Sequence, residues 1–490
     1  MGKVIRQSLF STIISYIGVA LGAFNTLWLI PKAMTTGEIG LYRVIISMAI
    51  LLVPFAQMGA VQSSIKFFPN YKTQKQRNGF FTLLLLATLG SFLVFMVFFF
   101  LLKEPIAGFF EERSPIVGEY LNLVLFLILM MVVFNILESY CRNMLEIIFP
   151  NFLKEVQLRL IVSLLVTLYL LGFIGFHQLL FGLVWNYMAA VTFLIFSLLF
   201  RYKLRISLSF KSIPLKPIIQ YALFSVLGTA GAVIVMQIDS IMISGLLGLD
   251  ENGIYTTAFF IAVLVEIPRR AISQISLPLI SKAFHEDQVS EVKRIYKSSS
   301  INLMLAGSLI YLLLVANLDN IFYLIPDWQR FEAGKIVVLI IGAIKLIDIG
   351  SGVNTEVIIM SKYYKFNILA ISILAILTII TNLILIPKYG LSGAAYATAI
   401  SIALFNLLKF LFIWIKLKLQ PFSLKSLGVI VLLILLLAGI PYLPKLPGVI
   451  PEIFLHSLIL TVLFLGISFA LKISSEMNGM VHKVLARFKS

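Results

Sequence analysis

Residues 79–102 read GFFTLLLLATLGSFLVFMVFFFLL, a run without a single charged side chain. An α-helix needs roughly 20 apolar residues to cross a hydrocarbon core of about 30 Å, and this run is long enough to do so. Its apolarity is continuous, whereas a strand of an outer-membrane barrel would alternate apolar and polar residues. The run therefore predicts a membrane-spanning helix.

Similar runs follow one another along the whole chain, which has 490 residues, of which 60% are apolar and 12% charged. A soluble domain carries about a quarter charged residues, so the bilayer is the main solvent expected here. The runs fall at 9–31, 40–65, 79–102, 119–140, 156–176, 178–200, 218–248, 254–281, 300–325, 336–361, 366–386, 391–415, 424–442 and 452–471. We therefore expect an all-α polytopic membrane protein with about fourteen transmembrane helices. No segment between the runs is long enough for a soluble catalytic domain.

The two halves of the chain repeat each other. Residues 36–42 read TGEIGLY and residues 250–255 read DENGIY, and each motif ends with Gly, an aliphatic residue and Tyr. Farther along, residues 177–182 match residues 388–393. The repeated unit holds six predicted helices, and an even number makes both units run in the same direction. We expect two parallel six-helix lobes related by a pseudo-twofold axis along the membrane normal.

The repeat predicts the domain organisation. The N-lobe spans 1–210, the C-lobe spans 211–420, and two extra C-terminal helices occupy 421–473. Residues 474–490 form a cytoplasmic tail that spaces apolar residues among basic ones. This pattern is typical of an amphipathic helix on an anionic membrane surface, and a disordered tail is the alternative.

The distribution of lysine and arginine predicts the orientation. Most of the loop cations lie on the side of both termini, and only a few lie in the alternate loops. Those few are Lys32, Lys103, Arg113, Arg330, Lys335, Lys388 and Lys445. By the positive-inside rule, both termini are expected in the cytoplasm. The same asymmetry accounts for most of the net charge of +17, so no nucleic-acid partner is expected.

Ionisable residues inside the predicted spans are costly, and each requires a partner or a function. They are Arg43, Glu138, Asp239, Glu266, Arg269, Arg270, Lys345, Asp348, Glu356 and Lys409. The spacing allows Glu266 to pair with Arg270, and Lys345 with Asp348, along single helices. Arg269 is then left over, which favours a water-filled cavity around the two arginines over a closed ion-pair network. For Lys345 both interpretations stay open.

Cations that face a central cavity predict an anionic cargo. Arginine suits a phosphate because its planar guanidinium donates two parallel hydrogen bonds. We find no glycine-rich phosphate loop for ATP, and the single Cys141 and the scattered histidines support neither a metal site nor a redox site. We expect a transporter that is not an enzyme and has no cofactor beyond a coupling ion.

The motifs together resemble a known family. Residues 36–43 (TGEIGLYR), 237–240 (QIDS), 249–255 (LDENGIY) and 386–395 (IPKYGLSGAA) are similar to those of polysaccharide-export flippases. These belong to the multidrug/oligosaccharidyl-lipid/polysaccharide (MOP) exporter superfamily and include the O-antigen flippases of lipopolysaccharide biosynthesis. The resemblance covers essentially the whole chain.

The resemblance implies a function and a set of site residues. The function is transfer of an undecaprenyl-diphosphate-linked oligosaccharide from the inner to the outer leaflet by alternating access, in surface polysaccharide biosynthesis. The polymerase and glycosyltransferases of that pathway are expected partners. The cationic substrate-binding cavity would map onto Arg43, Arg269, Arg270 and Lys345. A coupling site for Na⁺ or H⁺ would map onto Asp239, Thr378, Asn382 and Thr398, with pairing of Asp239 to Arg269 or Arg270 as the alternative.

Two other functions stay open. A multidrug or small-molecule antiporter of the same superfamily would couple its transport to a cation. Such an antiporter should have twelve helices and an acidic cavity, whereas this sequence predicts about fourteen helices and a cationic cavity. A membrane-embedded polysaccharide polymerase would need a larger outer loop than residues 103–118 provide. The glycan itself and the oligomeric state are not specified by the sequence.

Overall fold

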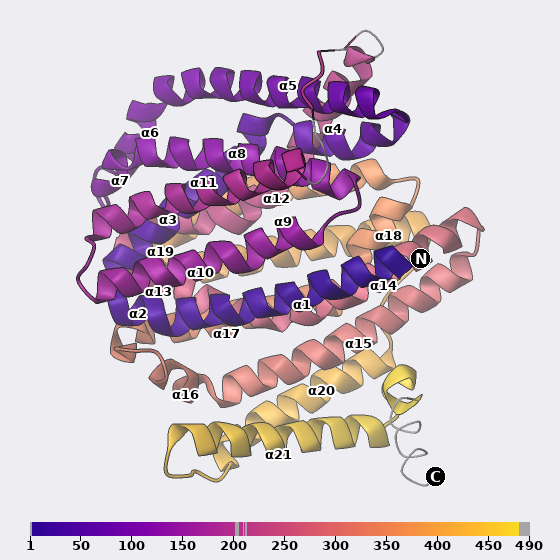
Figure 1. Ribbon diagram of the computed structural model, residues 1–490. Coiled ribbons are helices and arrows are strands. Elements are labelled where there is room, and N and C mark those ends of the chain that lie inside the picture. The colour runs from indigo at the N-terminus through magenta and orange to yellow at the C-terminus, as the bar shows by residue number, and fades with distance from the viewer. Residues whose placement is uncertain (1, 201–204, 209, 211–212, 480–490) are drawn as a thin grey trace. The chain divides into compact units, whose positions relative to one another are not determined.

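The computed structural model describes residues 2–200, 205–208, 210 and 213–479, and every regular element within them is a helix (Figure 1). The chain divides into two compact units, unit 1 at Met1–Thr256 and unit 2 at Thr257–Ser490. The predicted all-α fold is confirmed. The predicted tail at 474–490 lies mostly outside the described residues, because these end at residue 479.

Unit 1 contains the first twelve α-helices and most of the thirteenth. They are α1 (Gly2–Phe24), α2 (Ile30–Ala33), α3 (Thr36–Gln57), α4 (Ala60–Phe67), α5 (Gln74–Leu101), α6 (Lys103–Phe110), α7 (Ile116–Glu119), α8 (Leu121–Asn143), α9 (Ile148–Phe152), α10 (Leu158–Leu170), α11 (Phe176–Phe200), α12 (Leu215–Leu246) and α13 (Leu249–Ala262). Two π-helical turns, η1 (Asn25–Leu29) and η3 (Leu153–Gln157), and one 3₁₀ turn, η2 (Phe68–Asn70), connect some of them.

Local sequence explains where α3 begins. Thr35 precedes the helix in an extended conformation, and its side chain accepts a hydrogen bond from the Glu38 N–H at 3.2 Å. The Glu38 carboxylate in turn accepts the Thr35 N–H at 2.8 Å. This capping box satisfies two backbone donors that the first turn would otherwise leave unpaired. The repeated motif TGEIGLY is therefore the first turns of α3.

An aromatic cluster forms the core of unit 1 between α5 and α8. The rings of Tyr71 and Phe80 stack with centroids 4.5 Å apart, and Phe81 approaches Tyr140 at the same distance. All four side chains are buried. Aromatic pairs at this separation add to the stabilisation that burial alone provides.

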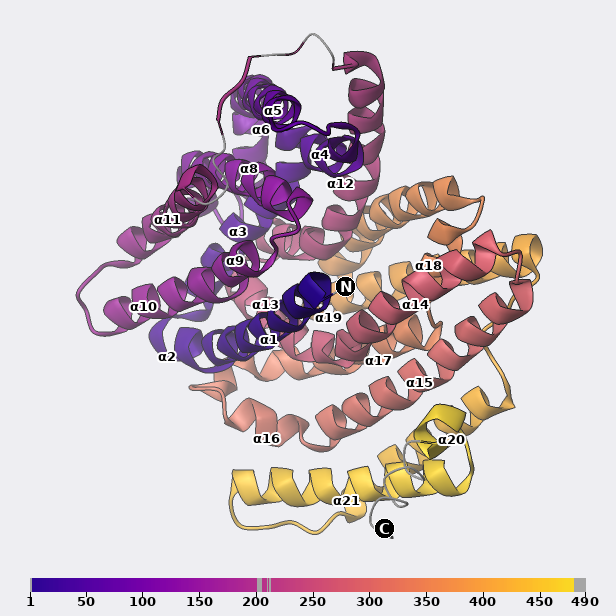
Figure 2. The same ribbon diagram turned by 45° about the vertical axis from the view of Figure 1, so that its right-hand side comes forward.

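Unit 2 contains the remaining helices. They are η4 (Val263–Glu266), α14 (Ile267–His285), α15 (Val289–Ala316), α16 (Leu318–Tyr323), η5 (Trp328–Gly334), α17 (Lys335–Gly350), α18 (Asn354–Met360), α19 (Tyr364–Leu417), α20 (Leu424–Gly439), η6 (Ile440–Tyr442) and α21 (Val449–Ala470), with the η elements in the 3₁₀ conformation. Both views show α20 between α15 and α21 (Figures 1 and 2). Leu312, Val429 and Phe464 bury the contact among these three helices.

Glycines interrupt the helices of unit 2 at two places. The span predicted at 336–361 is broken between α17 and α18, which meet at 43° across Gly352 with its φ of 73°. Helix α19 covers two predicted spans, and Gly390, with φ 60° and ψ −136°, separates its two limbs. Glycine adopts these conformations without the steric cost that a Cβ imposes. Interruption of a span exposes backbone groups, which membrane proteins tolerate where the break lines a cavity or contacts other helices.

Ten helices in the described part of the chain are long and apolar enough to span a membrane, and the α17–α18 pair makes an eleventh. The chain is thus a multi-pass membrane protein. The number fourteen stays a prediction, because α10 is only 13 residues long and α19 is counted once despite its break. The lobe boundaries at 210 and 420 also stay a prediction.

Candidate functional site

A closed ring of hydrogen bonds joins four helices at the break in the α17–α18 span. Its members are polar side chains of α14, α17, α18 and α19 within unit 2. In order around the ring they are Arg269, Asp348, Asn406, Asn354, Lys409 and Thr355. Because the ring closes on itself, each helix is tied to at least two neighbours.

Asp348 accepts the two shortest bonds of the ring. The Arg269 guanidinium donates to one carboxylate oxygen at 2.8 Å, and the Asn406 amide donates to the other at 2.8 Å. The side chains of Arg269 and Asp348 are only 16% and 12% exposed. A pair this well buried is screened little by solvent, so removal of one partner would leave a costly unpaired charge.

Lys409 closes the other side of the ring. Its ammonium donates to the side-chain amide oxygen of Asn354 at 3.1 Å and to the Thr355 hydroxyl at 3.3 Å, and it lies 4.0 Å from the centre of the Phe405 ring. The residue is 1% exposed. A lysine buried this completely requires such partners, because desolvation of an unpartnered ammonium is expensive.

Two further pairs adjoin the ring. Lys345 donates to Glu266 at 2.9 Å, and the Ser273 hydroxyl contacts the Glu356 carboxylate. With these pairs the cluster holds three cations and three carboxylates. The cations are Arg269, Lys345 and Lys409, and the carboxylates are Asp348, Glu266 and Glu356. Unit 2 therefore balances its charges at the broken span.

The pairs predicted along single helices are wrong. Lys345 forms an ion pair with Glu266 on η4 instead of with Asp348, and Asp348 forms its ion pair with Arg269. Glu266 ends the 3₁₀ turn η4 while Arg270 lies in α14, so the two do not share one regular α-helix. A 3₁₀ turn has about three residues per turn, which rotates Glu266 away from the position that an i,i+4 pair requires.

Arg270 differs from its neighbour. Its side chain is exposed, and within the described residues it makes no hydrogen bond or ion pair. Consecutive helical residues point about 100° apart, so α14 can direct Arg269 into the ring and Arg270 away from it. Of the predicted cationic residues of unit 2, Arg270 alone retains an uncompensated guanidinium in the described structure.

Arg43 lies in unit 1, on α3. Its guanidinium donates to the Thr26 hydroxyl of the π-helical turn η1 at 3.0 Å and lies 5.6 Å from the centre of the Tyr42 ring. Its Nε is buried and has no hydrogen-bond partner in the described part of the chain. Single π-helical turns inside longer helices are frequent at functional sites. The placement of Arg43 in one cavity with Arg269, Arg270 and Lys345 stays a prediction.

The predicted coupling residues are all buried. Asp239 accepts a hydrogen bond from the Tyr255 hydroxyl at 2.8 Å in unit 1. Thr378, Asn382 and Thr398 lie on the two limbs of α19, which meet where Thr381 and Ser401 bond at 3.0 Å. Arg269 has Asp348 as a partner within unit 2, and the alternative that Asp239 pairs with Arg269 or Arg270 stays a prediction. The coupling role itself stays a prediction.

The two copies of the repeated motif contact each other within unit 1. Asn252 donates to the Gly40 carbonyl at 3.0 Å, and the Thr36 hydroxyl bonds the Asp250 carboxylate. A Cβ on Gly40 would lie 1.8 Å from the Leu249 carbonyl oxygen, and one on Gly253 would lie 2.1 Å from the Thr36 carbonyl oxygen. We call this reciprocal contact the motif contact. Glycine is required on both sides because only it lets the two backbones approach this closely.

Sequence reasoning missed two features of the site. Lys409 was recognised as an intramembrane charge but not as the partner of Asn354, whose neutral amide gives no charge signal. Arg159 lies inside the predicted span 156–176 and pairs with Glu155 at 2.9 Å, so the rule applied to the other charges would have found it. The Asn25 amide donates to the Arg159 carbonyl oxygen at 3.0 Å, which links α10 to η1.

Comparison with solved structures finds this fold in two kinds of transporter. The lipid II flippase MurJ in its inward closed conformation superposes with a TM-score of 0.73 at 14% identity, covering 93% of this chain and 98% of that one. An inward-facing multidrug resistance MATE family transporter of the MOP superfamily gives a TM-score of 0.64 at 13% identity, covering 84% and 97%. A MATE in complex with MaL6 gives 0.55 at 14% identity, covering 84% and 94%.

The predicted MOP-superfamily fold is therefore confirmed. A search of curated protein sequences gave no match. A family profile with the description "Polysaccharide biosynthesis protein" matches residues 5–284, which is more than half of the chain. The resemblance seen in the sequence motifs is thus confirmed, and the chain belongs to the polysaccharide biosynthesis protein family.

Proposed function

We propose that this protein is a flippase for an undecaprenyl-diphosphate-linked oligosaccharide. It would move its cargo from the inner to the outer leaflet of a bacterial cytoplasmic membrane during biosynthesis of a surface polysaccharide. The observation that carries this proposal is the exposed guanidinium of Arg270, next to an arginine that is already neutralised. Membership of the polysaccharide biosynthesis family and the flippase-like fold support it.

The argument from Arg270 concerns cost. A cation at the centre of a bilayer costs about 2.5–3.5 kcal/mol on insertion scales, and Arg270 lies within the predicted span 254–281. Arg269, Lys345 and Lys409 offset that cost with partners in the chain. Arg270 has none in the described residues, so we infer that its partner is the cargo. A diphosphate offers the paired oxygens that a guanidinium fork binds best.

Alternating access would provide the movement. The motif contact joins the start of α3 to the start of α13. It would have to open when the cargo leaves from the end of the protein at which these two helices begin. An interior-negative potential favours export of an anion by about 2.3 kcal/mol per charge per 100 mV. On this proposal the protein lowers a barrier and needs no catalytic residue.

The second candidate is a small-molecule antiporter, favoured by the similarity to multidrug MATE transporters. The flippase structure covers a larger share of this chain, 93% against 84%. Moreover, the Asp348 carboxylate, which could attract a cationic drug, is occupied by Arg269 and Asn406. We therefore rank the flippase first. Coupling through Asp239, Thr378, Asn382 and Thr398 would be compatible with either function.

The test is complementation of a deletion strain with the wild type and three variants. Arg270→Ala should lower surface polysaccharide about tenfold or more, because a charge-assisted hydrogen bond contributes about 1.5–3 kcal/mol. Arg270→Lys should retain part of the activity, since it keeps the charge without the fork. Lys282→Ala, on the exposed end of the same helix, is the matched control and should complement fully.

Lipid-linked repeat units should accumulate on the inner leaflet of the Arg270→Ala strain, with normal amounts of the protein in the membrane. Normal surface polysaccharide in that strain would refute the assigned role of Arg270. Accumulation on the outer leaflet of the deletion strain would instead identify a polymerase.

A further inference from the structure

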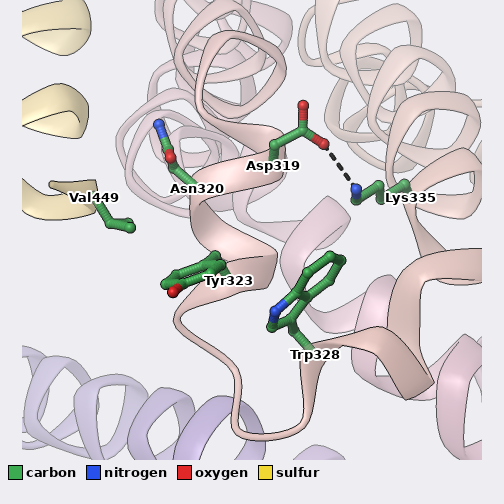
Figure 3. A pocket seen from close by; sticks show the side chains of 6 residues that line it. All are labelled: Asp319, Asn320, Tyr323, Trp328, Lys335 and Val449. Atoms are coloured by element: carbon green, nitrogen blue, oxygen red, sulfur yellow. Dashed lines mark ion pairs between the residues drawn. The ribbon is translucent and has the colours of Figure 1, made fainter. Parts of the chain in front are cut away.

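A pocket of roughly 370 Å³ lies in unit 2, at the end where α15 stops and α17 and α21 start. Figure 3 shows its lining side chains, which come from α16, η5, α17 and α21. They are Asp319, Asn320, Tyr323, Trp328, Lys335 and Val449. This volume is within the range of small-molecule binding sites, which runs from about 300 to 1,000 Å³.

Ion pairs hold the walls of the pocket in place. Lys335 bonds Asp319 at 2.8 Å and Glu332 at 3.3 Å, and its ammonium lies 5.5 Å from the centre of the Trp328 ring. The Asn320 amide donates to Glu452 of α21 at 3.2 Å, which fixes α16 against α21. A pocket whose side chains are already positioned loses little entropy when it binds a ligand.

Two aromatic rings offer an apolar surface to the pocket. Tyr323 and Trp328 lie with their centroids 6.1 Å apart and their planes at 40° (Figure 3). Tyr323 is 58% exposed, and the hydroxyl of Tyr323 and the indole N–H of Trp328 have no hydrogen-bond partner in the described residues. Tyr and Trp each combine a large apolar ring with one polar group, so this pair can contact an apolar face of a ligand and also hydrogen-bond to it.

The charges of the pocket exclude an anionic ligand. The only cation among the lining residues is Lys335, and two carboxylates already neutralise it. Asp319 has an 88% exposed side chain and therefore retains acceptor capacity for hydroxyl groups. Asn320 keeps a second N–H and its carbonyl oxygen. The pocket thus suits a neutral ligand with one C–H face and a rim of hydroxyls.

We propose that this pocket is a saccharide-binding subsite, in which Tyr323 and Trp328 stack on a sugar ring and Asp319 and Asn320 bind its hydroxyls. The inference rests on the proposed function, since it takes the sugar to be part of the transported glycan. On the predicted topology the loop at 326–335 faces the outside, so the subsite would receive the glycan as it leaves. It would also give α21, which lies outside the repeat, a part in glycan binding.

The test is a binding measurement on the full-length protein in nanodiscs. The probe is the free oligosaccharide released by mild acid from the lipid-linked precursor of the deletion strain. In a variant with Trp28, Trp185 and Trp414 replaced by Phe, Trp328 emission should change saturably with the probe. Tyr323→Ala and Asn320→Ala should each weaken binding about tenfold, in line with loss of an aromatic contact or a hydrogen bond. Calorimetric binding should be unchanged in the control Trp185→Ala, whose 64% exposed side chain lies in unit 1.

Two results would overturn the proposal. One is the absence of saturable binding, or equal binding by wild type and Tyr323→Ala. The other is quenching of Trp328 by brominated lipids as strong as that of Trp414 in a matched single-tryptophan variant, which would identify an aromatic membrane anchor. This experiment measures binding and not transport. A negative binding result would therefore leave the result of the Arg270→Ala complementation test unaffected. Conversely, saccharide binding together with normal transport by Arg270→Ala would refute only the proposed function.

Discussion

Arg269 and Arg270 are adjacent on α14 but have different environments. Arg269 enters the ring and bonds Asp348, whereas Arg270 is exposed and has no partner in the described residues. The sequence spacing paired Arg270 with Glu266 and left Arg269 over, which is the reverse of what the structure shows. Their roles differ because a rotation of about 100° separates consecutive side chains on a helix. We therefore assign stability to Arg269 and cargo binding to Arg270.

Stability measurements should separate these roles. Arg269→Ala leaves the Asp348 carboxylate buried without its cation, and breaking a buried pair in this way costs about 3–5 kcal/mol. The double variant Arg269→Ala/Asp348→Ala removes both charges and should recover most of the lost melting temperature. The matched control is Arg294→Ala, which breaks the exposed pair with Glu291 and should leave the melting temperature unchanged. Equal melting temperatures for Arg269→Ala and the double variant would contradict the assignment.

At the scale of elements, the repeated motifs act as a pair. The motif contact holds α3 against the segment that begins α13, through Asn252 and through the close approach at Gly40 and Gly253. The sequence revealed that the motifs correspond but not that they touch. Contact between residues more than two hundred positions apart depends on how the helices pack, which periodicity and composition do not encode.

Gly253→Val should disrupt the motif contact and impair transport, because its side chain would meet the Thr36 backbone. In a Cys141→Ser background, the thiol introduced by Thr36→Cys should react faster with a membrane-impermeant maleimide when Gly253→Val is present than when Gly253 is kept. Gly90→Val is the matched control, since a Cβ on Gly90 meets nothing within 4 Å. Unchanged labelling and wild-type transport by Gly253→Val would show that the contact has no part in the transport cycle.

The helices themselves could largely be predicted from the sequence. Continuous apolar runs located α5, α8, α11 and α12 to within a few residues, because burial in lipid makes length and apolarity the dominant signal. The break at Gly352 and the pairing of Lys345 with Glu266 were not predicted. The break at Gly390, in contrast, lies at the boundary between the predicted spans 366–386 and 391–415. These features depend on which helix faces which. The predicted cationic residues were correctly recognised as costly, but the sequence could not show that Arg269 and Lys345 already had partners.

For the whole molecule, the family, the fold and the charge distribution agree on one interpretation. The chain is a multi-pass membrane protein of a polysaccharide biosynthesis family with a fold shared by a lipid II flippase. Within the described residues of unit 2, Arg269, Lys345 and Lys409 have partners in the chain whereas Arg270 has none, and the pocket at the end of α15 suits a saccharide. A cargo with a diphosphate and a glycan would use both features.

The most direct test of this account is translocation in liposomes. The purified protein is reconstituted with a fluorescent undecaprenyl-diphosphate oligosaccharide, and the label that reaches the outer leaflet is followed by reduction with dithionite. We predict that wild-type protein translocates the lipid much faster than either Arg270→Ala or protein-free liposomes, and that Lys282→Ala matches the wild type. Equal rates for wild type, Arg270→Ala and empty liposomes would contradict the proposed function.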